Sequence, residues 1–240
     1  MVAVWRIMSN FALMKIAILS AMDKELELIL GLLENRTETS ADGLEAHIGN
    51  IGQHEVMAAK CGIGKVNSAL NTFRVIRSFS PDMVINSGVA GGADPSMAVG
   101  SLLIADGVAY HDVWCGPGTE EGTADGFPRV MIPSEKLISA ARDVVTGDNV
   151  RYGLICSGDR FISKAEEVAE IKRIFPEALA CDMESASIAQ TCMFCGVPFG
   201  IIRVVSDTPG CADNVSQYKN FWTDAPLRTF SAVENILKAL

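Results

Sequence analysis

The chain has 240 residues, and nearly half of them are apolar, enough to bury the core of one large α/β domain or of two small ones. Its formal net charge is −9 and it contains no basic block, which argues against nucleic acid or an anionic membrane surface as the main partner. The three histidines are not spaced to complete a zinc site, so no bound metal is expected.

Seven cysteines are scattered along the chain, an odd number without the spacing of a disulfide framework. Several fall inside apolar runs, where a free thiol packs as a small hydrophobic group. Cys192 and Cys195 could form a redox or metal-binding pair, but they lie within a helical pattern and no second pair accompanies them. This use of cysteine indicates a reducing, cytoplasmic setting.

The N-terminal residues 1–13 are too short and irregular for a secretory signal, and no apolar run is long enough to span a membrane. A strand pattern begins at Met14, which could also be the natural start. We therefore expect an N-terminal extension over 1–13 and a single domain over 14–240, because neither a linker nor an internal repeat interrupts the rest.

The first third of the chain predicts a strand at 15–20 and then a helix that begins near Glu25. Residues 44–61 alternate weakly and predict two strands, and a helix follows at 65–79. The Gly-Ile-Gly-Lys sequence ahead of that helix resembles a phosphate loop only superficially. The required glycine and hydroxyl residue are replaced by Ala59 and Val66, so we interpret it as a tight turn.

In the middle of the chain, a strand at 83–87 ends in the small residues 88–92, which would let a ligand approach the backbone. A strand at 102–105 precedes a polar loop that runs from about 110 to 128. This loop contains His111 and Asp112, which could be a catalytic pair. Neighbours on an extended segment point to opposite faces, which favours a structural role for them.

The last part of the chain continues the alternation of strands and helices. Ser163 and Glu166 have the spacing of a capping box. The elements expected here are a helix at 134–146, a strand at 152–156, a helix at 163–174, a strand ending at Asp182, a helix to about Cys195, a strand at 200–205, a polar loop with Tyr218, Phe221 and Trp222, and a helix at 224–239.

This alternation predicts a three-layer α/β/α fold with a central twisted mixed sheet. Glu25, Glu184 and Asp207 each follow a strand, so their carboxylates could share one cleft at the strands' carboxyl ends. A simpler reading remains for the acids at helix starts. Asp182 could be an N-cap, and Glu25 and Glu184 could be first-turn acids that match the helix dipole.

Seven short motifs in order resemble the 5′-methylthioadenosine/S-adenosylhomocysteine nucleosidase family, within the nucleoside phosphorylase superfamily, over about residues 14–239. The resemblance implies a nucleoside phosphorylase-like fold, hydrolysis of the N-glycosidic bond to release adenine, no metal or cofactor, and a homodimer. The motifs are Ala-Met-Asp-Lys-Glu at 21–25, Gly-Ile-Gly-Lys-Val at 62–66, Asn-Ser-Gly-Val-Ala-Gly at 86–91, Tyr-His-Asp at 110–112, Ser-Gly-Asp-Arg-Phe-Ile at 157–162, Asp-Met-Glu at 182–184 and Arg-Val-Val-Ser-Asp at 203–207.

The resemblance also implies roles for individual residues. Glu25 would activate the water with help from Arg203, and Asp207 would protonate N7 of adenine, which is a poor leaving group as an anion. Glu184 would bind the ribose hydroxyls and Phe161 would stack on the base. The full substrate-binding set that we expect is Met22, Ile63, Val89, Ala90, Gly91, Phe161, Ile162, Met183, Glu184, Ser206 and Tyr218.

Two departures from the family pattern and two rival functions complete the prediction. Family members often have Ser at Val89, where a hydroxyl can help to position the catalytic Asp, and the loop at 113–128 differs from the commonest form.

A phosphorolytic enzyme of the same fold would need an anion site, but Asn86 and Val89 stand there without a cation. A non-catalytic nucleoside-binding protein would need neither Glu25 nor Asp207. We therefore favour a hydrolase.

Overall fold

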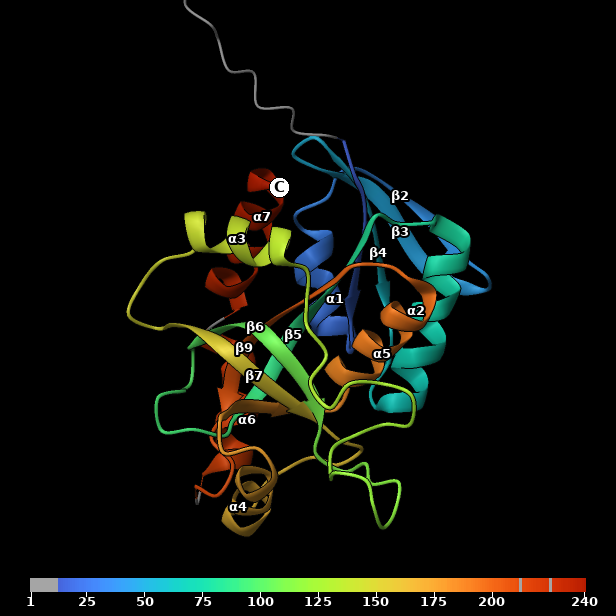
Figure 1. Ribbon diagram of the computed structural model, residues 1–240. Coiled ribbons are helices and arrows are strands. Elements are labelled where there is room, and N and C mark those ends of the chain that lie inside the picture. The colour runs from blue at the N-terminus through green and yellow to red at the C-terminus, as the bar shows by residue number, and fades with distance from the viewer. Residues whose placement is uncertain (1–12, 212, 225) are drawn as a thin grey trace, which may run out of the picture.

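The computed structural model describes residues 13–211, 213–224 and 226–240 (Figure 1), so the extension expected over 1–13 lies outside the described residues except for Leu13. The strands are β1 Lys15–Ser20, β2 Glu34–Ala41, β3 Leu44–Ile51, β4 His54–Lys60, β5 Met83–Gly92, β6 Leu102–Tyr110, β7 Val150–Ser157, β8 Ala178–Asp182 and β9 Phe199–Asp207. The helices are α1 Asp23–Leu30, α2 Lys65–Phe79, α3 Glu135–Val144, α4 Ala165–Ile174, α5 Ser185–Cys195, α6 Asn214–Asp224 and α7 Pro226–Ala239.

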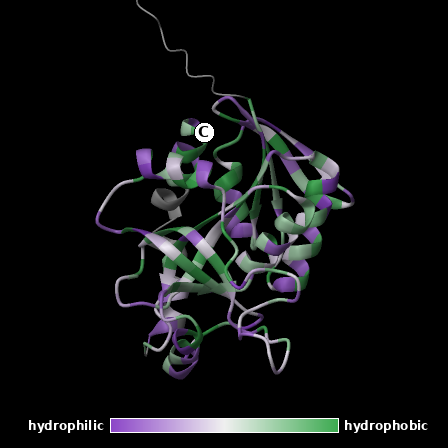
Figure 2. Cartoon of the chain, in the orientation of Figure 1, coloured by the Kyte–Doolittle hydropathy of each residue, from purple (hydrophilic) through white to green (hydrophobic). Residues whose placement is uncertain are grey.

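All of these strands belong to one mixed sheet with helices on both faces, which confirms the predicted three-layer α/β/α architecture. Helices α2 and α5 pack against each other on one face, while α1, α3 and α7 cover the other (Figure 1). Figure 2 shows the helices banded with hydrophobic and hydrophilic residues, as expected of helices with one face on a sheet. In the described chain, none of the helices has the length and apolarity needed to cross a membrane.

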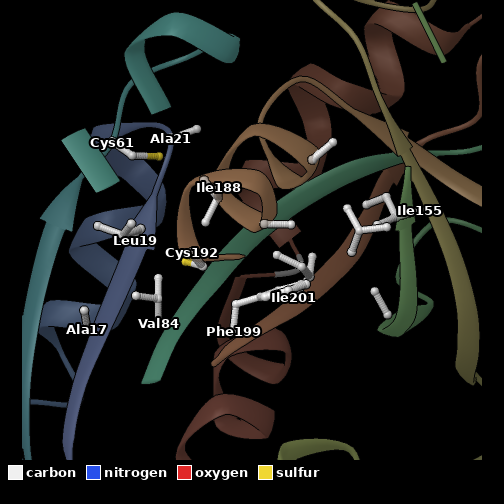
Figure 3. Packing of buried hydrophobic residues seen from close by; sticks show 14 of the residues in the cluster. Ala17, Leu19, Ala21, Cys61, Val84, Ile155, Ile188, Cys192, Phe199 and Ile201 are labelled. Atoms are coloured by element: carbon white, nitrogen blue, oxygen red, sulfur yellow. The ribbon is translucent and has the colours of Figure 1, made fainter. Parts of the chain in front are cut away.

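Two main apolar clusters fill the spaces between the layers. In the first, Ile188 and Cys192 of α5 lie among Val84, Phe199 and Ile201 of β5 and β9 (Figure 3). The second lies between the sheet and helices α1, α3 and α7. Because Cys192 is fully buried in this packing, its thiol is a core group and is not positioned for redox exchange.

The second half of the sheet closes on itself, a feature that the sequence did not predict. Strand β9 pairs in parallel with β5 and antiparallel with β6, while β6, β7 and β8 run parallel to one another. The ring is completed where β8 meets β5 antiparallel, by the pairs Cys181–Gly91 and Ala180–Gly92 alone. The last residues of β5 and β8, which run in opposite directions, therefore meet. The carboxyl ends of β5 and β9 and those of β7 and β8 come together at one site.

Two elements differ from the sequence prediction in kind. Strand β2 was not expected, because its side chains are mostly polar and exposed at an edge of the sheet. Helix α6 was expected to be a polar loop, because its sequence lacks a clear apolar stripe. The predicted capping box is also wrong by one residue. The carboxylate of Glu167, not that of Glu166, accepts the N–H groups of Ser163 and Lys164.

Candidate active site

A cavity lies where the carboxyl ends of the strands meet, with about 600 Å³ of empty space that includes its opening to solvent. It is lined by every residue that the sequence analysis placed in the site except Arg203, which lies behind its wall. These lining residues are Met22, Glu25, Ile63, Val89, Ala90, Gly91, Phe161, Ile162, Met183, Glu184, Ser206, Asp207 and Tyr218. The cavity is also lined by Ala21, Arg160, Cys181 and Asp182, which were not predicted to do so.

Glu25 is held by backbone donors from two strand ends. Its Oε2 accepts the N–H groups of Ala21 and Met22 at 2.8 and 2.9 Å, and its Oε1 accepts that of Val89 at 2.9 Å. Burial raises the pKa of Glu25, while Arg203 and these hydrogen bonds act in the opposite direction. A buried carboxylate that is fixed by donors and has a raised pKa is suited to act as a general base near neutral pH.

The glycine at the end of β5 makes room for this arrangement. A Cβ on Gly88 would stand 2.5 Å from Oε1 of Glu25 and 3.3 Å from Nη1 of Arg203. The sequence predicts that the small residues of 88–92 let a ligand approach the backbone. At Gly88 the approaching groups are instead the protein's own Glu25 and Arg203, which are thereby brought close to each other.

Arg203 is almost fully buried and forms an ion pair with Asp182. Its Nε and Nη2 lie 3.0 and 2.7 Å from Oδ2 of Asp182, and Nη2 also donates to Asn86 and Ser185. The same carboxylate accepts the hydroxyls of Ser157 and Ser185 and the N–H of Ser185. The N-cap of α5 is Glu184, so the alternative in which Asp182 is the N-cap and Glu184 a first-turn acid is wrong. Asp182 lies two residues before the N-cap and is the counterion that fixes Arg203 beneath the cavity.

Glu184 stands at the start of α5, facing the cavity. Its Oε1 accepts the N–H of Gly64, 3.1 Å away in the turn before α2. The tight turn predicted at this glycine therefore holds the side chain of Glu184 in place. Burial and the nearby Asp182 raise the pKa of Glu184 to about 8, although Arg203, 4.0 Å from its Oε2, opposes the shift. A buried carboxyl group at a ligand cavity can bind hydroxyl groups in either protonation state.

Asp207, at the end of β9, has side-chain partners where Glu25 has backbone partners. Oγ of Ser206 donates to its Oδ1 at 2.7 Å, and Nδ2 of Asn214 donates to its Oδ2. Burial raises the pKa of Asp207, while these two hydrogen bonds act against the shift. Val89, at the position where the resemblance noted a frequent Ser, has no hydroxyl to offer Asp207 and donates its backbone N–H to Glu25.

Two aromatic rings flank the entrance to the cavity. Phe161 and Tyr218 meet edge to face with centroids 5.7 Å apart, and the hydroxyl of Tyr218 lies 3.3 Å from Sδ of Met22. Phe161 is 47% exposed, so its ring is open to a planar ligand. This arrangement brings together side chains from the first strand end, the 157–162 loop and helix α6.

The His111–Asp112 pair does not line the cavity. The carboxylate of Asp112 forms an ion pair with Nζ of Lys65 at 2.8 Å and accepts the N–H of Asp159 at 2.9 Å. The carboxylate of Asp159 in turn accepts the N–H of Lys65. These contacts join the turn before α2 to the 157–162 loop, which is a structural role.

The sequence analysis did not single out Asn214, whose amide contacts the carboxylate of Asp207. Asn214 stands at the first position of α6, a helix that was not predicted, and no motif marks it. Among the described residues, no cluster of three His, Cys, Asp or Glu side chains could hold a metal ion. The polar side chains that line the cavity carry carboxyl groups, hydroxyls, the guanidinium of Arg160 and the thiol of Cys181.

Comparison with known proteins was made on both sequence and structure. The family model of the phosphorylase superfamily matches residues 15–238. A 5′-methylthioadenosine/S-adenosylhomocysteine nucleosidase from Lysinibacillus sphaericus is 38% identical over 231 residues, which cover 95% of this chain and 99% of the relative.

Two solved nucleosidase structures are similar over their whole length. The enzyme from Streptococcus pneumoniae, solved with the transition-state inhibitor methylthio-immucillin-A, has a TM-score of 0.90 at 34% identity and covers 94% of this chain and 99% of its own. The enzyme from Streptococcus pyogenes, solved with methylthiotubercidin, has a TM-score of 0.90 at 31% identity and covers 96% and 99%.

Proposed function

We propose, from the premise that this chain belongs to the 5′-methylthioadenosine/S-adenosylhomocysteine nucleosidase family of the phosphorylase superfamily, that it hydrolyses the N-glycosidic bond of both nucleosides to adenine and a thioribose product. The observation that carries the proposal is that two of the buried carboxyl groups of one cavity, those of Glu25 and Asp207, have hydrogen-bond partners of different character. Glu25 is fixed by three backbone donors, whereas Asp207 contacts two side chains that can each donate or accept.

This difference supports an assignment of base and acid. Backbone N–H groups can only donate, so they favour the ionised form of Glu25, which would take a proton from the attacking water. The partners of Asp207 allow the acid form, which would give its proton to N7 as the C1′–N9 bond breaks and the purine takes the electron pair. The sugar becomes oxocarbenium-like, and the nearby carboxylates stabilise this positive charge.

The remaining cavity residues would bind the two ends of the nucleoside. Glu184 would accept the ribose hydroxyls, with Met183 against the sugar. Phe161 would stack on adenine while the backbone of Ile162 reads the edge of the base. The side chains of Met22, Ile63 and Tyr218 would form the apolar region for the 5′-alkylthio group. No metal or cofactor takes part in this scheme.

The cavity is better suited to water than to phosphate as the attacking nucleophile. Asn86, at the position that matches the phosphorylase anion site, is fully buried and bonded to Arg203 and to the carbonyl of Leu19. Arg203 is itself paired with Asp182. Among the described residues that line the cavity, the one cation is Arg160, which forms an ion pair with Glu167 at 2.6 Å. A phosphate dianion would therefore meet carboxylates without a free cation.

The first experiment is adenine release from methylthioadenosine and S-adenosylhomocysteine, with and without added phosphate. We expect equal release in both conditions, with a free thioribose as the second product. Release only with phosphate, giving a ribose 1-phosphate, would contradict hydrolysis. Tight binding of nucleoside analogues without any release would favour the non-catalytic alternative.

The assembly that we propose is a homodimer in the cytoplasm. Val66, Leu70 and Phe73 of α2 and Phe194 of α5 form an exposed apolar surface, the α2–α5 face, with Phe194 79% exposed. Helices α2 and α5 lie side by side (Figure 1), and both begin at the cavity. Contiguous apolar surface of this kind is typical of a protein interface. All seven cysteines are free thiols, which suits a reducing compartment.

A charge on the α2–α5 face should separate the two copies. We expect light scattering to give twice the 25.7 kDa chain mass for the wild type and the single-chain mass for the Leu70→Glu, Phe194→Glu double variant. The Ile132→Glu variant is the matched control, because Ile132 is 65% exposed but lies outside this face. A wild-type monomer at micromolar concentration, or a double variant that stays dimeric, would contradict the proposal.

A further inference from the structure

Both side chains that contact the Asp207 carboxyl group can exchange donor and acceptor roles. Oγ of Ser206 lies 2.7 Å from Oδ1 of Asp207 and 3.3 Å from the carbonyl oxygen of Ala90. Its single hydrogen can therefore point to the carboxylate, or to Ala90 while Oγ accepts from the acid. The remaining contact, that of Asn214, is the more informative one.

Asn214 is 2% exposed, and its amide nitrogen donates to Oδ2 of Asp207. Its own Oδ1 is buried and has no hydrogen-bond partner among the described residues. A buried amide oxygen without a partner costs free energy, and no contact of that oxygen opposes rotation of the amide. If the amide turned over, Oδ1 would face the Asp207 oxygen that Nδ2 now contacts.

We propose that Asn214 is a positioning residue that follows the protonation state of Asp207. When Asp207 is the acid and no purine faces it, Oδ1 of Asn214 accepts its O–H; a bound purine turns that O–H away from Asn214 and toward N7. When the proton has passed to N7 of the departing purine, Nδ2 donates to the new carboxylate, as in this structure. The inference rests on the proposed role of Asp207 as general acid, and it adds the residue that lets one buried group hold and then release a proton.

The test compares two analogues that differ at position 7 of the base. Methylthio-immucillin-A carries a hydrogen on N7 and so needs an ionised Asp207 as acceptor, whereas methylthiotubercidin has carbon at that position and makes no such bond. For Asn214→Leu we expect turnover of methylthioadenosine to fall ~100-fold, within the range for an impaired general acid. By calorimetry, the preference for the immucillin over the tubercidin analogue should fall more than about tenfold, because the carboxylate has lost a donor.

Gln217→Ala is the matched control, because Gln217 lies on the same helix and accepts the N–H of Thr208 without contacting Asp207. It should keep the wild-type preference between the analogues. Asn214→Ala, which removes the same groups with less bulk, replaces the leucine variant should that not fold. An unchanged preference in a folded Asn214 variant would overturn the inference, whatever happens to turnover. Failure of the wild type to release adenine would instead refute the proposed function itself.

Discussion

Asp207→Asn should bind nucleoside analogues but lose ~10²- to 10⁴-fold in kcat on methylthioadenosine, the usual contribution of a positioned general acid. The amide cannot supply the proton that adenine needs as it leaves. The fold should tolerate the change, because Asn214 can turn its buried Oδ1 toward the new amide nitrogen and Ser206 can bond to the amide oxygen. The measurement is single-turnover adenine release, paired with calorimetric binding of methylthiotubercidin.

The matched control is Asp213→Asn, the same substitution at an exposed residue just before α6. This variant should retain wild-type kcat, because its carboxylate bonds to Gln217 and not to the cavity. A turnover number near that of the wild type in Asp207→Asn would remove Asp207 from the acid role. A loss of analogue binding equal to the loss of kcat would show damage to the site and not to its chemistry.

The positions of the acids could be predicted from the sequence because each one follows an apolar run. Glu25, Glu184 and Asp207 are placed by strand periodicity alone, and the structure brings all three to one cavity. The closure of the sheet could not be predicted in this way. It depends on β9 pairing with both β5 and β6, which are long-range contacts that no local pattern encodes.

The hydrogen-bond partners of these acids could not be predicted from the sequence either, for two physical reasons. Glu25 and Glu184 are bonded to backbone N–H groups of Val89 and Gly64, and a backbone donor has no side-chain signature. Asn214 lies on α6, whose polar sequence predicts a loop, so its approach to Asp207 depends on tertiary packing. Sequence patterns predict which groups can react, whereas the surrounding hydrogen bonds determine which protonation state each one takes.

Glu25→Gln should reduce kcat by ~10²- to 10⁴-fold, because a glutamine cannot take a proton from the attacking water. It should also change the pH dependence. Burial raises the pKa of Glu25, so the wild-type kcat/KM should rise with pH as this group ionises, at a pH above the ordinary value for Glu. The residual activity of the variant should lack that rise. The measurement is the steady-state rate between about pH 4 and pH 9, a range that covers the titration of most carboxyl groups and of histidine.

The structure also predicts a cost in stability for this variant. The carboxylate of Glu25 accepts backbone N–H groups at both oxygens, and a glutamine presents an oxygen at one position and an NH₂ group at the other. At least one buried N–H loses its acceptor, a loss of about 1–3 kcal/mol in the free energy of unfolding. Glu27→Gln, at an exposed position of the same helix, should change neither the rate nor the stability. If Glu25→Gln turned over at the wild-type rate while binding analogues normally, the base would have to be sought elsewhere in the cavity, with Glu184 the next carboxyl group to test.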